Sequence, residues 1–236
     1  MFLFIFMLEK LKREMQELSD PKRAEVNKWF FKTGPGQYGE GTQFIGVGTA
    51  DKRRLAKKYI DLSLEEVQKL LDDEVHDFRF LGLVILTNKF TKSKDKKIVD
   101  FYLKNTKNIN NWDLVDLSSY KILGEFLRDK DKSVLYKLAQ SENLWERRIA
   151  VISCFAFIRN NDFKDALKIS EMLLEDEHDL IHKAVGWMLR EVGKRNQSVL
   201  EGFLKNHYKK MPRTMLRYSI ERFEEDLRKK YLCGEV

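Results

Sequence analysis

At 236 residues the chain is long enough to bury a substantial core, as one large domain or as an elongated array of repeats. Only three prolines and twelve glycines are present, too few for the many hairpin turns of an all-β protein. Lysine and arginine outnumber aspartate and glutamate by 44 to 37, and the resulting net charge of +7 favours a polyanionic partner such as nucleic acid.

The apolar start "MFLFIFM" and the two cysteines bear on where the protein works. The start lacks the basic region and cleavage site of a signal peptide and is too short to span a bilayer, so we interpret it as the buried face of a first helix over residues 2–18. Cys154 and Cys233 form no CxxC motif, and Cys154 lies in an apolar run that predicts a buried thiol. We expect a reducing, cytoplasmic compartment and no membrane span.

Apolar residues recur at helical spacing through most of the remaining chain. Pro21 follows "SD" at a predicted first helical turn, and Ser63 with Glu66 forms a capping box before "LEEVQKLL". Later runs such as "VLYKLA" and "ALKISEMLL" continue the pattern. The one long irregular stretch is Thr33–Gly48. The pattern predicts about a dozen helices, no strand and therefore an all-α fold.

A hidden repeat with a period of about 35 residues runs through these helices. A charged residue recurs at intervals of 34, 34, 36 and 34 positions, and a usually small residue follows it three positions later. This spacing is typical of stacked helical pairs, so we predict a HEAT-like helical-repeat solenoid with a concave basic groove. The charged positions are Arg79, Asp113, Arg147, Lys183 and Arg217, and those that follow are Gly82, Asp116, Ala150, Gly186 and Ile220.

The stretch "NNWDLVDLSS" departs from this repeat. Asp116 occupies a position where other repeats carry glycine or alanine, and Trp112 precedes it by one helical turn, on the same face. Such a departure tends to mark function, and an indole beside an acid can hold a cation. The alternative is that Asp116 pairs with a basic residue of the next repeat, such as Arg148. The pattern favours neither reading.

Gly34, Gly36 and Gly39 match the G-x-G-x-x-G motif of dinucleotide sites. That motif requires a preceding strand, whereas these glycines follow a predicted helix in a chain without strands. We therefore interpret the segment as a surface loop whose backbone amides could meet a DNA phosphate.

His178 and His182 have the four-residue spacing of zinc-binding histidines. The residue after the first histidine is aspartate rather than glutamate, and no third ligand is evident. We expect neither a metal nor another cofactor.

Basic residues cluster at 51–59, 145–151 and 211–223. Each cluster is either a solvated helix face or a set of phosphate contacts.

Several motifs, in order and over nearly the whole chain, resemble the AlkD family of DNA alkylation-repair glycosylases. They are "KTGPGQYGEGTQFIGV" with "DKRRLAKKY", "NNWDLVDLSS", "NLWERRIAVIS", "IHKAVGWMLREVGK" and "MPRTMLRYSIERF". The resemblance implies one HEAT-like domain over residues 1–236 that excises N3-alkyladenine and N7-alkylguanine from duplex DNA without base flipping. It also implies a monomer in the cytoplasm, associated with the nucleoid when bound to DNA.

The resemblance also implies roles for particular residues. Asp116 falls on the family's catalytic carboxylate, and Trp112 and Trp187 fall on the aromatics that cradle the sugar of the lesion. Arg148 corresponds to a DNA contact, and Trp29 corresponds to a third aromatic. The expected DNA-binding residues are Arg148, Arg147, Trp29, Lys52, Arg53, Arg54, Lys183, Arg190, Arg213 and Arg217.

These roles agree with the chemistry of a cationic lesion. An alkylated purine that already bears a positive charge leaves without a general acid, and a carboxylate stabilises the charge that grows on the sugar. Two other functions stay open on the sequence: a DNA-binding relative without glycosylase activity, and a protein-binding scaffold, which is the commoner role of such solenoids.

Overall fold

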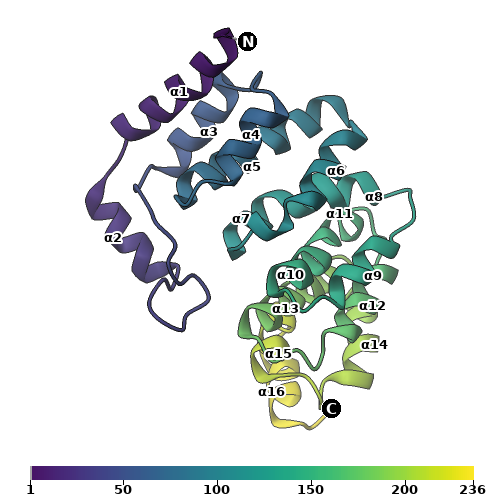
Figure 1. Ribbon diagram of the computed structural model, residues 1–236. Helices are drawn as coiled ribbons and strands as arrows, with labels where there is room; N and C mark the ends of the chain where they lie inside the picture. The colour runs from purple at the N-terminus through teal and green to yellow at the C-terminus, as the bar shows by residue number, and fades with distance from the viewer. Residues whose placement is uncertain (1) are drawn as a thin grey trace. The chain divides into compact units, whose positions relative to one another are not determined.

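The computed structural model describes residues 2–236, with side chains from residue 7 onward, and is built from helices (Figure 1). Within residues 2–236 the only β-type pairing is an isolated bridge between Gln43 and Val75. The predicted all-α helical-repeat fold is thus confirmed. None of the described helices is both long and apolar enough to cross a membrane.

The chain divides into two compact units, residues 1–118 and 119–236. The single domain predicted over residues 1–236 stays a prediction. The helices of the first unit are α1 (Phe2–Glu17), α2 (Pro21–Phe30), α3 (Thr49–Lys58), α4 (Leu64–Leu71), α5 (His76–Ser93), α6 (Lys96–Lys104), the short 3₁₀ turn Thr106–Asn108, and α7 (Trp112–Ser119), which ends at the boundary.

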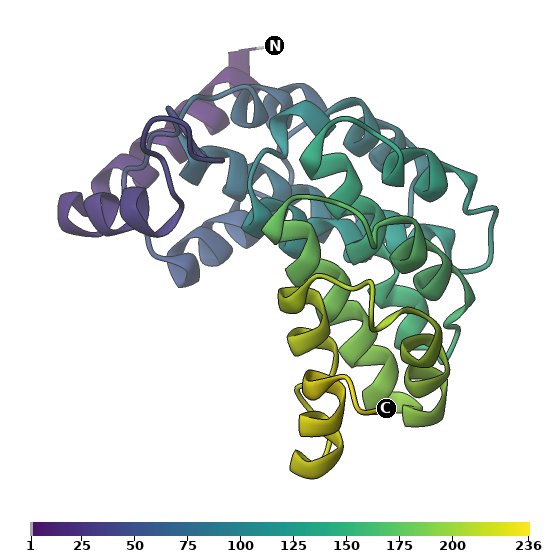
Figure 2. The same ribbon diagram turned by 90° about the horizontal axis from the view of Figure 1, so that it is seen from below.

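The second unit begins with a π-helical turn, Tyr120–Gly124, directly after α7. Its remaining helices are α8 (Glu125–Leu127), α9 (Ser133–Ala139), α10 (Leu144–Ser153), α11 (Phe155–Ile158), α12 (Lys164–Met172), α13 (Asp179–Arg195), α14 (Gln197–His207), α15 (Arg213–Ser219) and α16 (Glu225–Cys233). In this unit the second helix of one helical pair packs on the second helix of the next: α10 packs on α13, and α13 packs on α15. Figure 2 shows α13 and α15 side by side.

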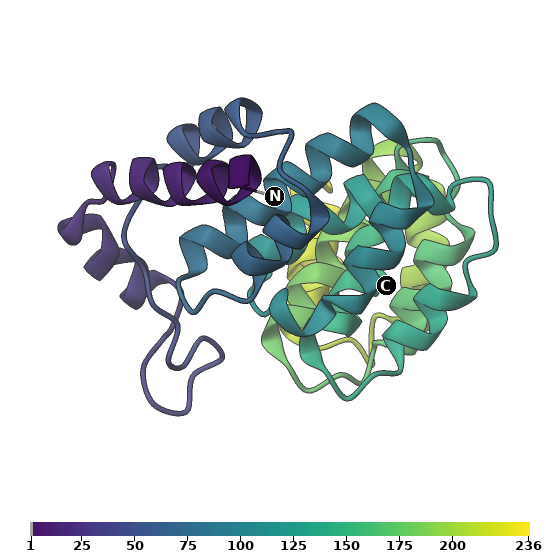
Figure 3. The same cartoon turned by 45° about the horizontal axis from the view of Figure 1, so that its top comes forward.

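The predicted helix starts are confirmed. The Asp20 side chain accepts a hydrogen bond from the Arg23 amide with Pro21 at the first position of α2, and the Ser63–Glu66 capping box opens α4. Helix α1 buries Leu8, Leu11 and Met15 and lies beside α3 (Figure 3). At the end of α3, Lys58 and Tyr59 both donate to the Glu14 carboxylate of α1. The predicted burial of the first apolar residues falls mostly on side chains 1–6, outside the described ones.

The repeat predicted from charge spacing is confirmed in the helices. The charged positions all lie in the second helix of a pair: in α5, α7, α10, α13 and α15. Arg79 donates to the carbonyl oxygens of Asp73 and Glu74, and Arg147 donates to those of Ser141 and Glu142, at the same offsets of six and five residues. In these two repeats the arginine therefore holds the turn that precedes its helix.

The small residues of the repeat mark close packing between helices. A Cβ added to Gly186 would lie 2.5 Å from the Cβ of Tyr218 on α15, and one added to Gly82 would lie 3.1 Å from the Cβ of Leu70 on α4. Ala150 is fully buried. On α7 the corresponding residue is Asp116, which is half-buried.

Candidate active site

Five rings from four segments of the first unit pack together, and we call Phe30, Phe31, Phe44, His76 and Trp112 the Trp112 cluster. Phe31 stacks on Trp112 with centroids 5.3 Å apart and planes 24° from parallel, and Phe30 meets the indole edge-on at 5.7 Å. Phe44 stacks on Phe31 at 5.2 Å. One face of the half-buried indole is therefore covered by Phe31, and the ring is held from α2 and from the loop that follows it.

The first turn of α7 is fixed by two polar contacts. The Asn111 side chain accepts a hydrogen bond from the Trp112 amide at 2.8 Å. The Asp113 carboxylate oxygen Oδ1 lies 2.9 Å from Nε2 of the buried His76 on α5. This contact ties Asp113 to α5.

Asp116 follows Trp112 by one helical turn and is half-exposed. Its surroundings include the buried Tyr102, whose hydroxyl lies 3.2 Å from the Ser118 hydroxyl. Burial raises the pKa of Tyr102; the hydrogen bond with Ser118 opposes that rise, and the nearby Asp116 carboxylate adds to it. Asp116 is thus half-buried and close to Tyr102 in the core of the first unit.

Helix α2 ends in exposed aromatic side chains next to this cluster. Trp29 is 74% exposed and Phe30 is 50% exposed, and the Lys32 ammonium lies 5.1 Å from the Trp29 ring centroid. Trp29 thus stands at the surface, outside the Trp112 cluster. The glycine-rich loop predicted at Thr33–Gly48 follows as an irregular segment.

Two glycine amides of this loop, which was predicted to offer backbone amides to a phosphate, already have partners. The Gly34 amide donates to Gln37 Oε1 at 3.0 Å, and the Gly36 amide donates to Glu40 Oε2 at 2.8 Å. A phosphate would have to displace these side chains.

Trp187, a predicted cradle for the sugar, and Arg148, a predicted DNA contact, belong to the second unit. Trp187 on α13 is half-buried and packs near Phe155, with ring centroids 6.0 Å apart, and Phe155 meets Tyr120 of the π-helical turn edge-on at 5.3 Å. Arg148 on α10 is 5% exposed and donates to the Leu180 carbonyl oxygen at 2.5 Å.

Lys52 and Arg147, both predicted as DNA contacts, are engaged inside the fold. Lys52 is 5% exposed, and its ammonium lies 2.9 Å from Oδ1 of the fully buried Asp77. Arg147 bonds Asp176 at 2.6 Å in addition to the two turn carbonyls. Both charges therefore have an acidic partner within the fold, and their role as DNA contacts stays a prediction.

The remaining basic candidates are exposed or half-buried. Arg53 and Arg54 are exposed on α3, Arg54 being paired with Asp51; Lys183 pairs with Asp179, and Arg190 pairs with Glu221. Arg213 is exposed and donates to the Leu232 carbonyl, and Arg217 is exposed on α15.

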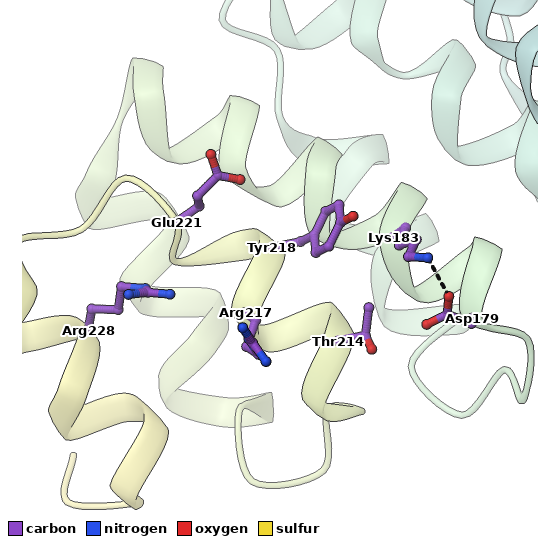
Figure 4. Close-up of a pocket in the computed structure, with 7 residues that line it drawn as sticks. All are labelled: Asp179, Lys183, Thr214, Arg217, Tyr218, Glu221 and Arg228. Atoms are coloured by element: carbon purple, nitrogen blue, oxygen red, sulfur yellow. Dashed lines mark ion pairs between the residues drawn. The ribbon is translucent and has the colours of Figure 1, made fainter. Parts of the chain in front are cut away.

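A surface pocket of about 380 Å³ collects several charged side chains of the second unit. In Figure 4 the Lys183–Asp179 ion pair lies at one end and Arg228 lies at the other, with Thr214, Arg217 and Tyr218 between them. Both acids of the pocket are paired with basic groups, Asp179 with Lys183 and Glu221 with Arg190. The pocket therefore keeps an excess of positive charge at Arg217 and Arg228.

His178 and His182, which have the spacing of zinc-binding histidines, both make hydrogen bonds near the start of α13. The His178 side chain accepts a hydrogen bond from the Leu180 amide at the start of α13, and the His182 ring contacts the Asp176 carbonyl oxygen. Among the residues whose positions are described, no three histidine, cysteine or acidic side chains come together as a metal site.

Sequence reasoning missed Phe31, Phe44 and His76. Each contributes a ring to the Trp112 cluster from a segment far from Trp112 in sequence. The only available signal was the aromatic pair at 30–31 just before the glycine-rich loop.

The fold and this site define an all-α helical-repeat protein with a half-exposed tryptophan–aspartate pair on one of its helices. A family model described as DNA alkylation repair enzyme matches residues 11–223, so this chain belongs to the DNA alkylation repair enzyme family. The match extends through both compact units.

Solved structures show the same fold. A protein from Enterococcus faecalis described as a predicted DNA alkylation repair enzyme is 17% identical, with a TM-score of 0.71 over 88% of this chain and 97% of its own. AlkD2 from Streptococcus mutans is 19% identical, with a TM-score of 0.56 over 75% of this chain and 91% of its own. The smu.31 protein of Streptococcus mutans is 18% identical, with a TM-score of 0.54 over 93% of this chain and 98% of its own. No curated protein matches the chain in sequence.

Proposed function

We propose that this DNA alkylation repair enzyme is a glycosylase that hydrolyses the N-glycosidic bond of cationic alkylpurines, N3-alkyladenine and N7-alkylguanine, in duplex DNA. The observation that carries the proposal is the half-buried Asp116 one turn after Trp112, at a position where helix packing favours glycine or alanine. Departures from a repeat of this kind concentrate at functional sites.

The chemistry follows from the charge of the lesion. When the bond between the sugar C1′ and the purine nitrogen breaks, the electron pair goes to the purine, which leaves as a neutral base without a general acid. Positive charge grows on the deoxyribose, and the Asp116 carboxylate stabilises it. Water then adds to C1′, oriented or deprotonated by the same carboxylate, and leaves an abasic site.

Trp112 adds stabilisation through its ring. An indole face near a developing cation contributes roughly 0.5–2 kcal/mol. Phe31 covers one face of the indole, so the opposite face or the edge is the part that meets the sugar. Trp187 and Arg148, from the second unit, are proposed as a second aromatic and a DNA contact on the strength of their sequence motifs.

We propose that the enzyme selects its substrates by the lability of the lesion rather than by reading a flipped base. An enzyme that flips a base encloses it in a shaped pocket and reads its edge, and it can select neutral bases by that route. Stabilisation of a sugar cation by Asp116 helps only when the purine already leaves readily. Neutral lesions should therefore be poor substrates.

Duplex DNA would be held through its phosphates by the exposed basic side chains. A monomer would do this in the cytoplasm, at the nucleoid. The candidates are Arg53, Arg54, Lys183, Arg190, Arg213 and Arg217, none of which is buried.

The test is incubation of the protein with a duplex that contains N7-methylguanine and with a matched duplex that contains a neutral lesion such as hypoxanthine. Released base and abasic sites are measured against a protein-free control that corrects for spontaneous depurination. The proposal expects release of the cationic base alone. Binding without release would identify a DNA-binding protein without glycosylase activity, and neither binding nor release would favour a protein scaffold.

A further inference from the structure

His76 is a buried histidine at the start of α5 to which the reaction above gives no role. It is 1% exposed, and its Nε2 lies 2.9 Å from Oδ1 of Asp113, whose side chain is 15% exposed. Since an ionised carboxylate only accepts, Nε2 carries the proton and donates. The other ring nitrogen, Nδ1, is buried and has no hydrogen-bond partner in the described part of the chain.

The ring of His76 lies among aromatic side chains. Its centroid is 4.8 Å from that of Phe44 and 5.1 Å from that of Phe31, and Phe80 lies at 6.4 Å. Phe31 in turn stacks on Trp112. His76 therefore reaches the first turn of α7 by two routes, a hydrogen bond to Asp113 and a ring contact through Phe31.

Packing alone does not account for a histidine here. A phenylalanine would fill the same aromatic surroundings and would leave no buried nitrogen unpaired, which is costly in a protein interior. What the imidazole supplies beyond a ring is its donated hydrogen bond, and that bond ends on the acid next to Trp112 in the chain.

We propose that His76 is a positioning residue for base excision, an inference that rests on the proposed function: by donating to Asp113 it fixes the first turn of α7 and so the direction of the Trp112 indole and the Asp116 carboxylate. Asp113 then acts as an anchor between α7 and α5 rather than as a second catalytic acid. Misplacement of a reacting group by about 1 Å can slow an enzyme by about 100-fold, so such an anchor matters for rate.

Four variants separate this role from packing and from catalysis by Asp113. His76→Phe keeps a ring and removes the donor, and Asp113→Ala removes the acceptor and leaves the aromatic packing intact. Asp113→Asn keeps an oxygen that accepts from Nε2 but removes the charge. The double variant His76→Phe/Asp113→Ala tests whether both single changes break the same contact.

The first readout does not depend on activity. The protein is labelled with 5-fluorotryptophan, and the ¹⁹F resonance of Trp112 is assigned by its loss in Trp112→Phe. We expect a shifted or broadened Trp112 resonance in His76→Phe and Asp113→Ala, and a resonance like that of the wild type in Asp113→Asn.

The second readout is single-turnover excision of N7-methylguanine at saturating protein. His76→Phe and Asp113→Ala should each slow excision by about 10- to 100-fold, and the double variant should be no slower than either. Duplex affinity should be unchanged, and Asp113→Asn should excise close to the wild-type rate.

The two readouts separate failure of this inference from failure of the proposed function. A wild-type protein without excision would end the proposed function, while the ¹⁹F comparison would still decide whether His76 orients Trp112. An unchanged Trp112 resonance in both His76→Phe and Asp113→Ala would overturn the inference, as would excision lost equally in Asp113→Asn and Asp113→Ala. If His76→Phe does not fold, Asp113→Ala and Asp113→Asn give the same comparison.

Discussion

Phe31 and Trp112 stack with ring centroids 5.3 Å apart, although Phe31 directly follows α2 and Trp112 is the first residue of α7. The stack holds the indole one helical turn before the half-buried Asp116. The proposed site therefore depends on contacts between segments that are distant in sequence.

Phe31→Leu tests this stack. Leucine fills much of the same volume but offers no flat ring, so the indole should lose its fixed orientation. We expect excision at saturating protein to slow by about 10-fold, with duplex affinity unchanged. Phe90→Leu is the matched control, since Phe90 is fully buried on α5; it should lower the melting temperature and leave excision intact. Equal excision rates in the two variants would contradict the role of the stack.

Lys52→Met tests the buried ion pair. It would leave the fully buried Asp77 without its 2.9 Å partner, and loss of one member of a buried pair costs about 3–5 kcal/mol of unfolding free energy. Arg53→Met changes the same charge at an exposed neighbouring position and should alter stability by no more than about 0.5 kcal/mol. Urea unfolding of the two variants makes the comparison. Equal free energies of unfolding in the two variants would show that the charge of Lys52 does not stabilise the fold.

Arg217→Ala tests the proposed phosphate contacts through the salt dependence of duplex binding. Each phosphate contact contributes about 0.9 to the slope of log affinity against log salt, so this variant should lower the slope by roughly that amount. Lys96→Ala removes an exposed charge that pairs with Asp100 in the first unit and lies outside the predicted set. It should leave the slope unchanged. A slope unaffected by Arg217→Ala would remove that residue from the DNA contacts.

The two thiols should differ sharply in reactivity. Burial raises the pKa of the Cys154 thiol, so the reactive thiolate is scarce at neutral pH and is shielded as well, whereas Cys233 is exposed. A thiol reagent should titrate one group per chain in the native protein and the second only after unfolding. Rapid titration of both thiols in the folded state would contradict the burial of Cys154.

The sequence predicted the regular features of the fold because they depend on local spacing. Charges every 34 to 36 residues located the second helix of each pair, and the capping box at Ser63 and the proline at position 21 marked helix starts that the structure confirms. Trp112 and Asp116 were found for the same reason, since both lie on one turn of one helix.

Residues whose role depends on a distant partner could not be predicted in this way. The sequence shows the charge of Lys52, but its partner Asp77 lies 25 positions away. Likewise, Asp176, which pairs with Arg147, lies 29 positions away. His76 carried no spacing signal at all, because its importance comes from a contact with Asp113 on another helix. Sequence periodicity reports on faces of single helices and not on which faces meet.

The measurement that tests the account most directly is single-turnover excision of N7-methylguanine by Asp116→Asn, with Asp113→Asn as the matched control. Asparagine keeps the shape of the side chain and removes the charge that would stabilise the sugar cation. The account predicts that Asp116→Asn binds the duplex as tightly as the wild type and excises at least about 100-fold more slowly, while Asp113→Asn excises normally. Excision by Asp116→Asn at the wild-type rate would contradict the central role of that carboxylate.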